Sequence, residues 1–342
     1  MRRSTFLNEK RLRAEGGGLR AKRNCFFLSS QLLALSLLFF LSGCGPKFTY
    51  PAQSVPKAIE DIGKKEYKLD IVARVVGKTV GALLYVDKLI DDKGQIPKEV
   101  HEAMGKVMQV VQRVSLSTDL PIDYCTTVIR DKNQPNELVI TRALDDTKRA
   151  NADMIGIEES INRTLFGQSK YEPPAAGKDS GFVLKDVRKE EFLAEQIVQR
   201  IRFSFAKDAK DEASQPFVLV DGAFEEKEGV KGFYVSIIAF KADDPRKMIL
   251  DIFKVANVVL SGYHFTAFDI IEIQDYLNRQ KLVIDQKTLL DYQQKKINDE
   301  ALLAKCLTES QSIQEAFKLF GFNPPQGSAD AGDAPIATAP AP

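Results

Sequence analysis

The segment Leu69–Val86, LDIVARVVGKTVGALLYV, is the most informative stretch for the fold of the first half of the chain. Apolar residues take alternate positions on both sides of Gly77-Lys78, a two-residue break that suits a hairpin turn with Gly at its first position, as in type II′. Pairing across this turn places Val75 opposite Val80, and it brings every alternating residue to one face. The segment therefore predicts a β-hairpin with one buried face, made of Leu69, Ile71, Ala73, Val75, Val80, Ala82, Leu84 and Val86.

The residues after the hairpin alternate between helical and strand-like patterns. From Val100 to Val114 apolar residues recur at steps of three and four, which is typical of an amphipathic helix, and we expect this helix to pack on the hairpin. Two strands, Tyr124–Arg130 and Glu137–Ala143, flank a turn around Pro135. A helical region is predicted to follow, from about Leu144 to Phe166.

The second half of the chain repeats this order with a different composition. All periodicity stops between Gly167 and Gly181, and no Phe occurs from Thr49 to Leu165, whereas fifteen lie from Phe166 to Phe322. The predicted elements of the second half are a helix with the buried stripe Leu193, Ile197, Ile201 and Phe205, strands Phe217–Glu225 and Gly232–Phe240, a helix after Asp244-Pro245, a strand Phe265–Ile273, and a helical remainder that includes a capping box from Ser312 to Glu315.

These patterns predict an α+β protein with two small domains, each containing a β-hairpin–helix–strand unit, and a helical C-terminal segment. Met108–Asp131 aligns loosely with Phe253–Asp275, which suggests a diverged internal duplication; the alternative is two ordinary α+β units with similar packing needs. The predicted divisions are a signal peptide (1–43), a flexible tether (44–66), a first domain (67–166), a linker (167–181), a second domain with C-terminal helices (182–322) and a disordered tail rich in Pro and Ala (323–342).

Composition and charge exclude several classes of protein. Hydrophobic residues make up 44% of the chain and charged residues 28%, which is ordinary for a globular protein. The first 43 residues hold eight Lys or Arg and two Glu, so 40 basic and 45 acidic residues remain after them. A mildly acidic body offers no cluster of cations for phosphates, and we therefore expect no nucleic-acid partner.

The N-terminal region has the features of an export signal. Its apolar run Leu32–Leu41, LLALSLLFFL, is about half as long as the roughly 20 residues that a membrane-spanning helix needs, so it predicts a signal-peptide core. The run ends in Leu41-Ser42-Gly43-Cys44, which resembles the lipobox of bacterial lipoproteins at all four positions. The alternative is an uncleaved N-terminal helix with an incidental Cys.

The resemblance to the lipobox implies a site of modification and a location. It implies cleavage between Gly43 and Cys44, a thioether-linked diacylglycerol on Cys44, and an acyl chain such as palmitate on the new amino terminus. Several acyl chains anchor a protein durably, whereas a single chain does not. Gly at position 45 in place of Asp favours, by the same resemblance, an outer-membrane lipoprotein that faces the periplasm.

Two cysteines, Cys125 and Cys306, remain in the mature chain within an oxidising compartment. They either form a disulfide or stay apart as two buried thiols, since no pattern in the sequence brings them together. No Cys or His spacing suits a metal site.

The sequence contains no assembled catalytic set. A hydrolase needs a base beside its nucleophile, and the only histidines are His101, early on an amphipathic helix, and His264, where a helix gives way to a strand. A surface position accounts for His101 without a catalytic role. A turn that ends the helix accounts for Gly262, beside His264, in the same way. We therefore expect no catalytic residue, no metal and no cofactor.

Three short motifs resemble functional loops but also fit simple structural roles. Gly77-Lys78-Thr79 lacks the preceding glycine of a phosphate-binding loop, and the hairpin turn already explains Gly77. A calcium loop at Asp91-Asp92-Lys93-Gly94 would place Leu89 at its first ligand, so a solvated turn is favoured. Asp145-Asp146 forms an acid–base couple or, as we favour, the acidic start of a helix with i,i+3 ion pairs.

The sequence thus leads to a non-catalytic, lipid-anchored envelope protein that serves as a scaffold or binding module for another envelope component. The main alternative is an anchored carrier or sensor of an apolar ligand, using the Phe-rich second domain as its pocket. An envelope hydrolase is a third, less supported hypothesis.

Overall fold

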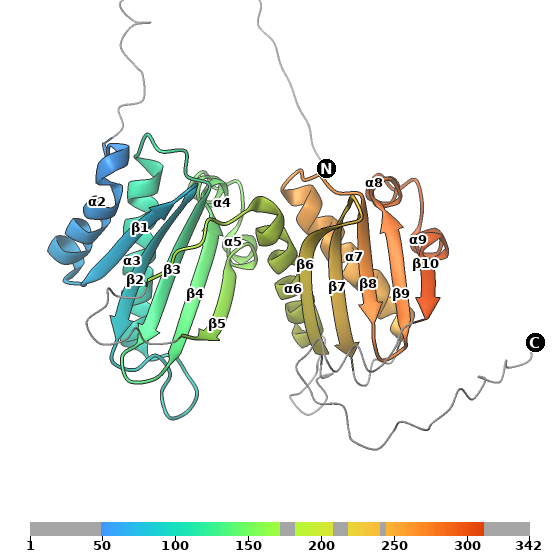
Figure 1. The fold of residues 1–342 in the computed structure, drawn as a ribbon, viewed down its shortest axis with the longest axis horizontal. Coiled ribbons are helices and arrows are strands. Elements are labelled where there is room, and N and C mark those ends of the chain that lie inside the picture. Colours follow the sequence, from blue (N-terminus) through green and yellow to red (C-terminus); the bar gives the residue numbers. More distant parts are fainter. Residues whose placement is uncertain (1–48, 172–181, 208–217, 240–243, 311–342) are drawn as a thin grey trace, which may run out of the picture. The chain divides into compact units, whose positions relative to one another are not determined.

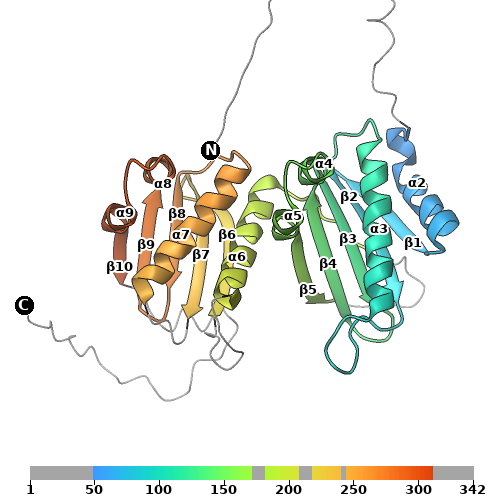
Figure 2. The same ribbon diagram turned by 180° about the vertical axis from the view of Figure 1, so that it is seen from behind.

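A computed structural model of the chain describes residues 49–171, 182–207, 218–239 and 244–310. The predicted signal peptide, Gly43, Cys44, the capping box at Ser312 and the predicted tail all lie outside these residues. The described residues form two five-stranded sheets with helices, so the predicted α+β class is confirmed (Figures 1 and 2).

The first sheet has its strands in sequence order. Its second and third strands are parallel, and the other neighbours are antiparallel. The five strands are β1 (Ile71–Val76), β2 (Thr79–Val86), β3 (Tyr124–Asp131), β4 (Asn136–Ala143) and β5 (Leu165–Lys170).

The predicted hairpin is confirmed from Ile71 to Leu84, whereas the expected pair of Leu69 with Val86 lies outside the paired residues. Val75 pairs with Val80 and Ile71 with Leu84, and only the first residue of the turn, Gly77, has a positive φ (54°), as a type II′ turn requires. The helix α3 (Lys98–Leu116) packs against the predicted apolar face, where its valines meet the strand residues. In Figure 2 this helix lies in front of the strands.

The expected tether from 44 to 66 is wrong over most of its length. Residues from Ala52 onward form the short helix η1 (Ala52–Ser54), the helix α2 (Val55–Ile62) and the π-helical turn η2 (Gly63–Tyr67). Val55 and Ile59, one helical turn apart, are fully buried against the first sheet. The Glu60 carboxylate accepts a hydrogen bond from the Ala73 N–H at 3.0 Å, which covers the outer edge of β1.

The helix predicted from Leu144 to Phe166 is divided in two, and a strand follows it. The helices are α4 (Leu144–Asn151) and α5 (Ile157–Asn162), separated by a turn in which Asp153 has a φ of 53°. The strand β5 then uses residues that we had assigned to the end of the helix and to the linker. Its pairing with β4 depends on a distant partner, and the local pattern does not reveal it.

The second sheet has the same topology as the first, with a parallel pair in the corresponding place. The segment predicted to be helical after Phe265–Ile273 contains two strands that we missed. Its strands are β6 (Val218–Lys227), β7 (Val230–Ala239), β8 (Ile270–Asp275), β9 (Gln280–Asp285) and β10 (Leu307–Ser310), and its helices are α6 (Lys189–Lys207), α7 (Pro245–Gly262), α8 (Gln286–Gln293) and α9 (Asp299–Lys305).

The two halves repeat one arrangement: a helix, a hairpin, a helix, a second hairpin, two short helices and a last strand. The backbone N–H of Asp123 donates to the Lys78 carbonyl, and that of Asp269 donates to the Lys231 carbonyl, which matches the two halves in register. The topology is what an internal duplication would produce. Counted from the starts of β3 and β8, Asp275 corresponds to Ile129. At the ends of these strands, where the N–H groups of Lys132 and Tyr276 donate to the carbonyls of Val86 and Ile237, Asp131 and Asp275 coincide as aligned.

The segment Phe182–Val187, which we call the strap, crosses the face of the first sheet opposite α3. Phe182 and Leu184 are buried there against Leu83 and Val128. A Cβ on Gly81 would lie 2.5 Å from a Leu184 methyl carbon, so any larger residue at this position would push the Leu184 side chain aside. The predicted start of the second domain at 182 is therefore wrong, because the strap packs on the first sheet.

Candidate functional site

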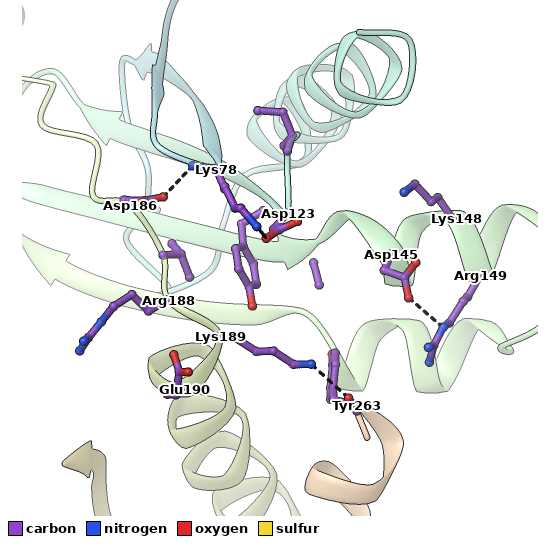
Figure 3. A pocket seen from close by; sticks show the side chains of 14 residues that line it. Lys78, Asp123, Asp145, Lys148, Arg149, Asp186, Arg188, Lys189, Glu190 and Tyr263 are labelled. Carbon is purple, nitrogen blue, oxygen red and sulfur yellow. Dashed lines mark hydrogen bonds and ion pairs between the residues drawn. The ribbon is translucent and has the colours of Figure 1, made fainter. Parts of the chain in front are cut away.

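A cleft of about 590 Å³ lies between the two halves, at the end of the first sheet where β3 begins and β4 ends (Figure 3). Its walls come from the β1–β2 turn, the residues before β3, the start of α4, the end of the strap with the start of α6, and Tyr263 after α7. The ionisable lining residues are Lys78, Asp123, Tyr124, Asp145, Lys148, Arg149, Asp186, Arg188, Lys189, Glu190 and Tyr263.

The Gly77-Lys78-Thr79 turn binds a carboxylate of its own chain. Asp186 Oδ1 accepts hydrogen bonds from the Lys78 backbone N–H at 2.9 Å and from the Thr79 hydroxyl at 3.2 Å. The Thr79 oxygen in turn accepts from the Val187 N–H at 2.8 Å. A Cβ on Gly77 would lie 2.0 Å from the Asp186 carboxylate, so glycine serves both the turn and this contact. The motif therefore fastens the strap.

Ion pairs connect most of the cations on the cleft wall to neighbouring carboxylates. Lys78 Nζ lies 3.0 Å from Asp123 Oδ2, and Arg149 Nε lies 3.2 Å from Asp145 Oδ2. The latter pair is spaced i,i+4 instead of the i,i+3 that we expected, and its carboxylate stands in the first turn of α4. The Lys78–Asp123 pair is largely exposed and contributes little to stability, whereas Arg149 is partly buried and also donates to the Gly262 carbonyl at 3.3 Å.

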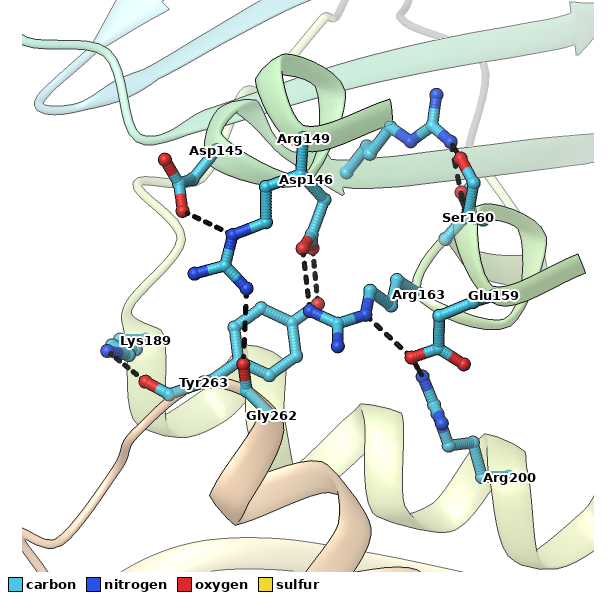
Figure 4. Close-up of polar contacts among 12 residues, drawn as sticks. Asp145, Asp146, Arg149, Glu159, Ser160, Arg163, Lys189, Arg200, Gly262 and Tyr263 are labelled. Atoms are coloured by element: carbon cyan, nitrogen blue, oxygen red, sulfur yellow. Dashed lines mark hydrogen bonds and ion pairs between the residues drawn. The ribbon is translucent and has the colours of Figure 1, made fainter. Parts of the chain in front are cut away.

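A buried network joins the halves beneath the cleft (Figure 4). Asp146, 1% exposed, accepts hydrogen bonds from Arg163 NH1 at 2.9 Å and from the Tyr263 hydroxyl. The Arg163 guanidinium also lies over the Tyr263 ring, 5.0 Å from its centroid. One acidic residue of α4 thus binds an arginine from the end of α5 and a tyrosine from the end of α7.

A second carboxylate extends this network to α6. Glu159 Oε1 accepts from Arg163 Nε at 2.7 Å and from Arg200 NH2 at 3.0 Å. Burial disfavours the charged form of Glu159, but the two guanidinium groups outweigh it and lower the pKa of this carboxyl. The pair of arginines therefore keeps Glu159 ionised at the junction of the halves.

Two tyrosines at the cleft are held in their neutral form. Burial raises the pKa of Tyr263 well above its ordinary value, and the negative charge of Asp146 adds to the shift. Burial also raises the pKa of Tyr124, with Asp123 and Glu190 contributing in the same direction. Both phenols are therefore hydrogen-bond donors at neutral pH and are poor general bases.

The two histidines do not take part in the cleft. Both are exposed, and neither lines it. His264 has a φ of 50° and ends α7, where the Phe265 N–H reaches back to the Leu260 carbonyl. The helix-stop turn is thus made by His264, whereas Gly262 stays in the helix; a Cβ on Gly262 would approach Arg163 NH2 to 3.0 Å.

Cys125 and Cys306 are free thiols, the first buried and the second half-buried. Burial raises the pKa of each thiol to about 11.

Among residues 49–171, 182–207, 218–239 and 244–310 no group of three or more His, Cys, Asp or Glu is arranged to hold a metal ion. Near the first sheet, Asp91 Oδ1 accepts from the Lys93 and Gln95 N–H groups, which confirms a turn there.

The phenylalanines of the second half pack on one another. The Phe233 ring centroid lies 5.0 Å from that of Phe224, 5.9 Å from that of Phe265 and 5.6 Å from that of Phe268. Phe253 and Phe192 are buried in the same cluster. The rings around Phe233 form a packed core, whereas Phe192 also lines a second cleft of about 260 Å³ together with Phe182 and Leu184.

Sequence reasoning missed the central residues of the site. The sequence offers Asp146 as half of an acid–base couple or, as we favoured, as part of a helix start, and it does not single out Arg163, Arg200 or Tyr263. The sequence offered one signal for this site, the two consecutive acidic residues at an expected helix start. One of them falls on the buried side of that helix. The partners follow 17 and 117 residues later in the chain, where no local pattern points to them.

Comparisons with protein-family models, with curated proteins and with solved structures find no match to this chain. Within the part of the chain that the structure describes, every helix is too short or too polar to cross a bilayer.

Proposed function

We propose that this chain is a lipid-anchored lipoprotein of the cell envelope that acts as a non-catalytic scaffold or binding module for another envelope component. Its anchor is the diacylglycerol on Cys44, its membrane is the outer membrane, and its folded part faces the periplasm. The cleft between the halves binds the partner.

The observation that carries this proposal is the charge pattern of the cleft. Its wall alternates cations and anions, from Lys78 with Asp123 to Arg149 with Asp145. Lys148 and Arg188 are exposed on the same wall. A partner segment with charges of both signs can exchange these weak surface pairs for intermolecular ones, which favours specificity over affinity.

Two features weigh against the other hypotheses. The described lining of the cleft contains no Ser, Cys or His, so a nucleophile paired with a base is missing from it, which argues against a hydrolase. The Phe-rich core is filled by edge-to-face contacts, which argues against a carrier of apolar ligands.

The anchor is tested by metabolic labelling with a clickable fatty acid. Wild-type protein should be labelled and should sediment with membranes, and Cys44→Ser should lose the label. The matched control is Cys306→Ser, which leaves the proposed lipobox intact and should keep the label. Equal labelling of wild type and Cys44→Ser would contradict the anchor.

The cleft is tested by site-specific photo-crosslinking in intact cells. A photoreactive residue at Lys148 should capture one envelope partner, and Arg188→Glu in the same protein should abolish the capture. The control position is Lys98, at the start of α3 and outside the cleft, which should not capture it. The same products from Lys98, or an unchanged product with Arg188→Glu, would contradict this assignment.

A further inference from the structure

Three large apolar side chains on the α4–α5 segment are exposed. Met154 is 72% exposed, Ile157 82% and Ile161 53%. Ile157 and Ile161 lie one turn apart on α5, and Met154 precedes that helix. We call these three residues the apolar tip.

The repeat shows that the fold does not require apolar residues at two of these positions, those of Met154 and Ile157. The second half repeats the α4–α5 segment as α8 and α9 with the same spacing, and the positive φ of Asp153 recurs at Lys295. The counterparts of Met154 and Ile157 are therefore Lys296 and Asp299, which form ion pairs with Asp291 and Lys254. Met154 and Ile157 are thus apolar where the repeat carries charges, whereas the counterpart of Ile161 is Leu303, which packs against the second core.

The apolar tip lies at the same end of the first sheet as the entry of the chain. The Tyr50 N–H donates to the Ser117 carbonyl at 3.1 Å, just after α3 and before β3. The α4–α5 segment joins the end of β4 to the start of β5. Since β3 begins opposite the last residue of β4, both features belong to one end of the sheet.

The segment that joins Cys44 to Tyr50 is short. Tyr50 is the sixth residue after Cys44. An extended chain spans at most about 3.6 Å per residue, so the Tyr50 Cα lies within about 22 Å of the Cys44 Cα. A lipid on Cys44 thus keeps this end of the sheet close to the bilayer, instead of suspending it on a long tether.

From these observations we propose that the apolar tip inserts into the interface of the bilayer that holds the Cys44 lipid. The occupant of this surface is a lipid membrane, and the proposal rests on the lipid anchor of the proposed function. Isoleucine and methionine side chains gain by leaving water for the acyl boundary, and the anchor supplies them at high effective concentration. The tip fixes the orientation of the first half on the membrane.

The test measures the depth of a fluorophore in the anchored protein. Gly156 lies between Met154 and Ile157, and a Cβ there meets no atom within 4 Å, so Gly156→Cys places a label without removing the tip. The control label is Lys93→Cys, in the exposed turn after β2, at the opposite end of the sheet. Cys125 and Cys306 should react slowly at neutral pH because burial raises their thiol pKa.

Both proteins, full length and lipidated in cells, are purified and placed in vesicles of phosphatidylethanolamine and phosphatidylglycerol that contain nitroxide-labelled lipid. The label at Gly156→Cys should be quenched at least about twofold more than that at Lys93→Cys, because only the former lies at the lipid interface. Adding Met154→Ser and Ile157→Ser should reduce its quenching to the level of Lys93→Cys. Adding Leu290→Ser, an exposed residue of α8, should leave it unchanged.

The outcomes separate this proposal from the proposed function. If the protein carries the fatty-acid label and sediments with vesicles but quenching is equal at the two positions, the membrane-inserted tip is refuted and the anchor stands. Unchanged quenching after the Met154→Ser and Ile157→Ser substitutions refutes it as well. If the protein carries no lipid and stays off the vesicles, both proposals fall.

Discussion

At the scale of single residues, Asp146 is a buried carboxylate whose two oxygens both accept hydrogen bonds. It is nearly inaccessible and holds Arg163 and Tyr263 with its two oxygens. Its neighbour Asp145 has a 66% exposed side chain and pairs with Arg149 at the surface. Two consecutive aspartates therefore have opposite roles, because successive residues of a helix point about 100° apart.

This difference predicts different costs of removing each carboxylate. Asp146→Ala removes one of the two carboxylates that pair with the buried Arg163 and leaves the Tyr263 hydroxyl without its acceptor, so it should lower the free energy of unfolding by up to about 3–5 kcal/mol. Asp145→Ala removes an exposed pair and should cost less than about 1 kcal/mol. Urea denaturation followed by circular dichroism measures both, and equal costs would contradict the assigned roles.

The neutral tyrosines predict a dependence of stability on alkaline pH. The folded state raises the pKa of Tyr263 and Tyr124, whereas an unfolded tyrosine ionises near pH 10. The contribution of these raised pKa values to the free energy of unfolding is complete below about pH 10 and is lost as the pH rises further. The reason is that only the unfolded state then releases the tyrosine protons. The urea concentration at the midpoint of unfolding should fall between pH 8 and pH 11, and it should fall less steeply for Tyr263→Phe than for the wild type. Equal slopes for the two proteins would contradict a raised pKa of Tyr263.

At the scale of elements, the strap shows how the first sheet is covered. One face packs against α2 and α3, and the strap lays Phe182 and Leu184 on the other. Two glycines of the hairpin make room for it, Gly77 at the Asp186 carboxylate and Gly81 at Leu184. The two glycines of the hairpin thus leave the space that the strap, about 100 residues later in the chain, occupies.

The close packing at Gly81 predicts that its substitution releases the strap. Gly81→Ala forces Leu184 aside and should lower the free energy of unfolding by about 1–3 kcal/mol. Trypsin should then cut at Lys185 faster than in the wild type. The control is Gly105→Ala inside α3, where nothing lies near an added Cβ and stability should rise by up to about 1 kcal/mol. Unchanged proteolysis of Gly81→Ala would contradict the packing.

At the scale of the whole molecule, the two halves share buried residues as well as a topology. Tyr124, Ala143 and Leu165 of the first half belong to the same apolar cluster as Phe192 and Ile197 of α6. Gln199 of α6 pairs with the edge of β5, accepting from the Phe166 N–H at 2.8 Å and donating to the Thr164 carbonyl at 2.7 Å. The helix that begins the second half thus also covers the first sheet.

This sharing predicts that the halves unfold together. Scanning calorimetry of the mature protein should show one transition, since separation would expose the shared apolar cluster and the Asp146 network. In Asp146→Ala the transition should shift to lower temperature and broaden or divide. Two well-separated transitions in the wild-type protein would show that the halves are independent.

Local signals in the sequence were sufficient to predict some elements of this protein. The hairpin at Gly77-Lys78, the helix α3 and the strands β3 and β4 follow from periodicity and turn chemistry within about 20 residues. The tertiary structure alone decided that α2 is packed, that β5, β9 and β10 join sheets, and that Asp146 meets Tyr263. Those features depend on partners far along the chain, which supply the burial and hydrogen bonds that a local pattern lacks.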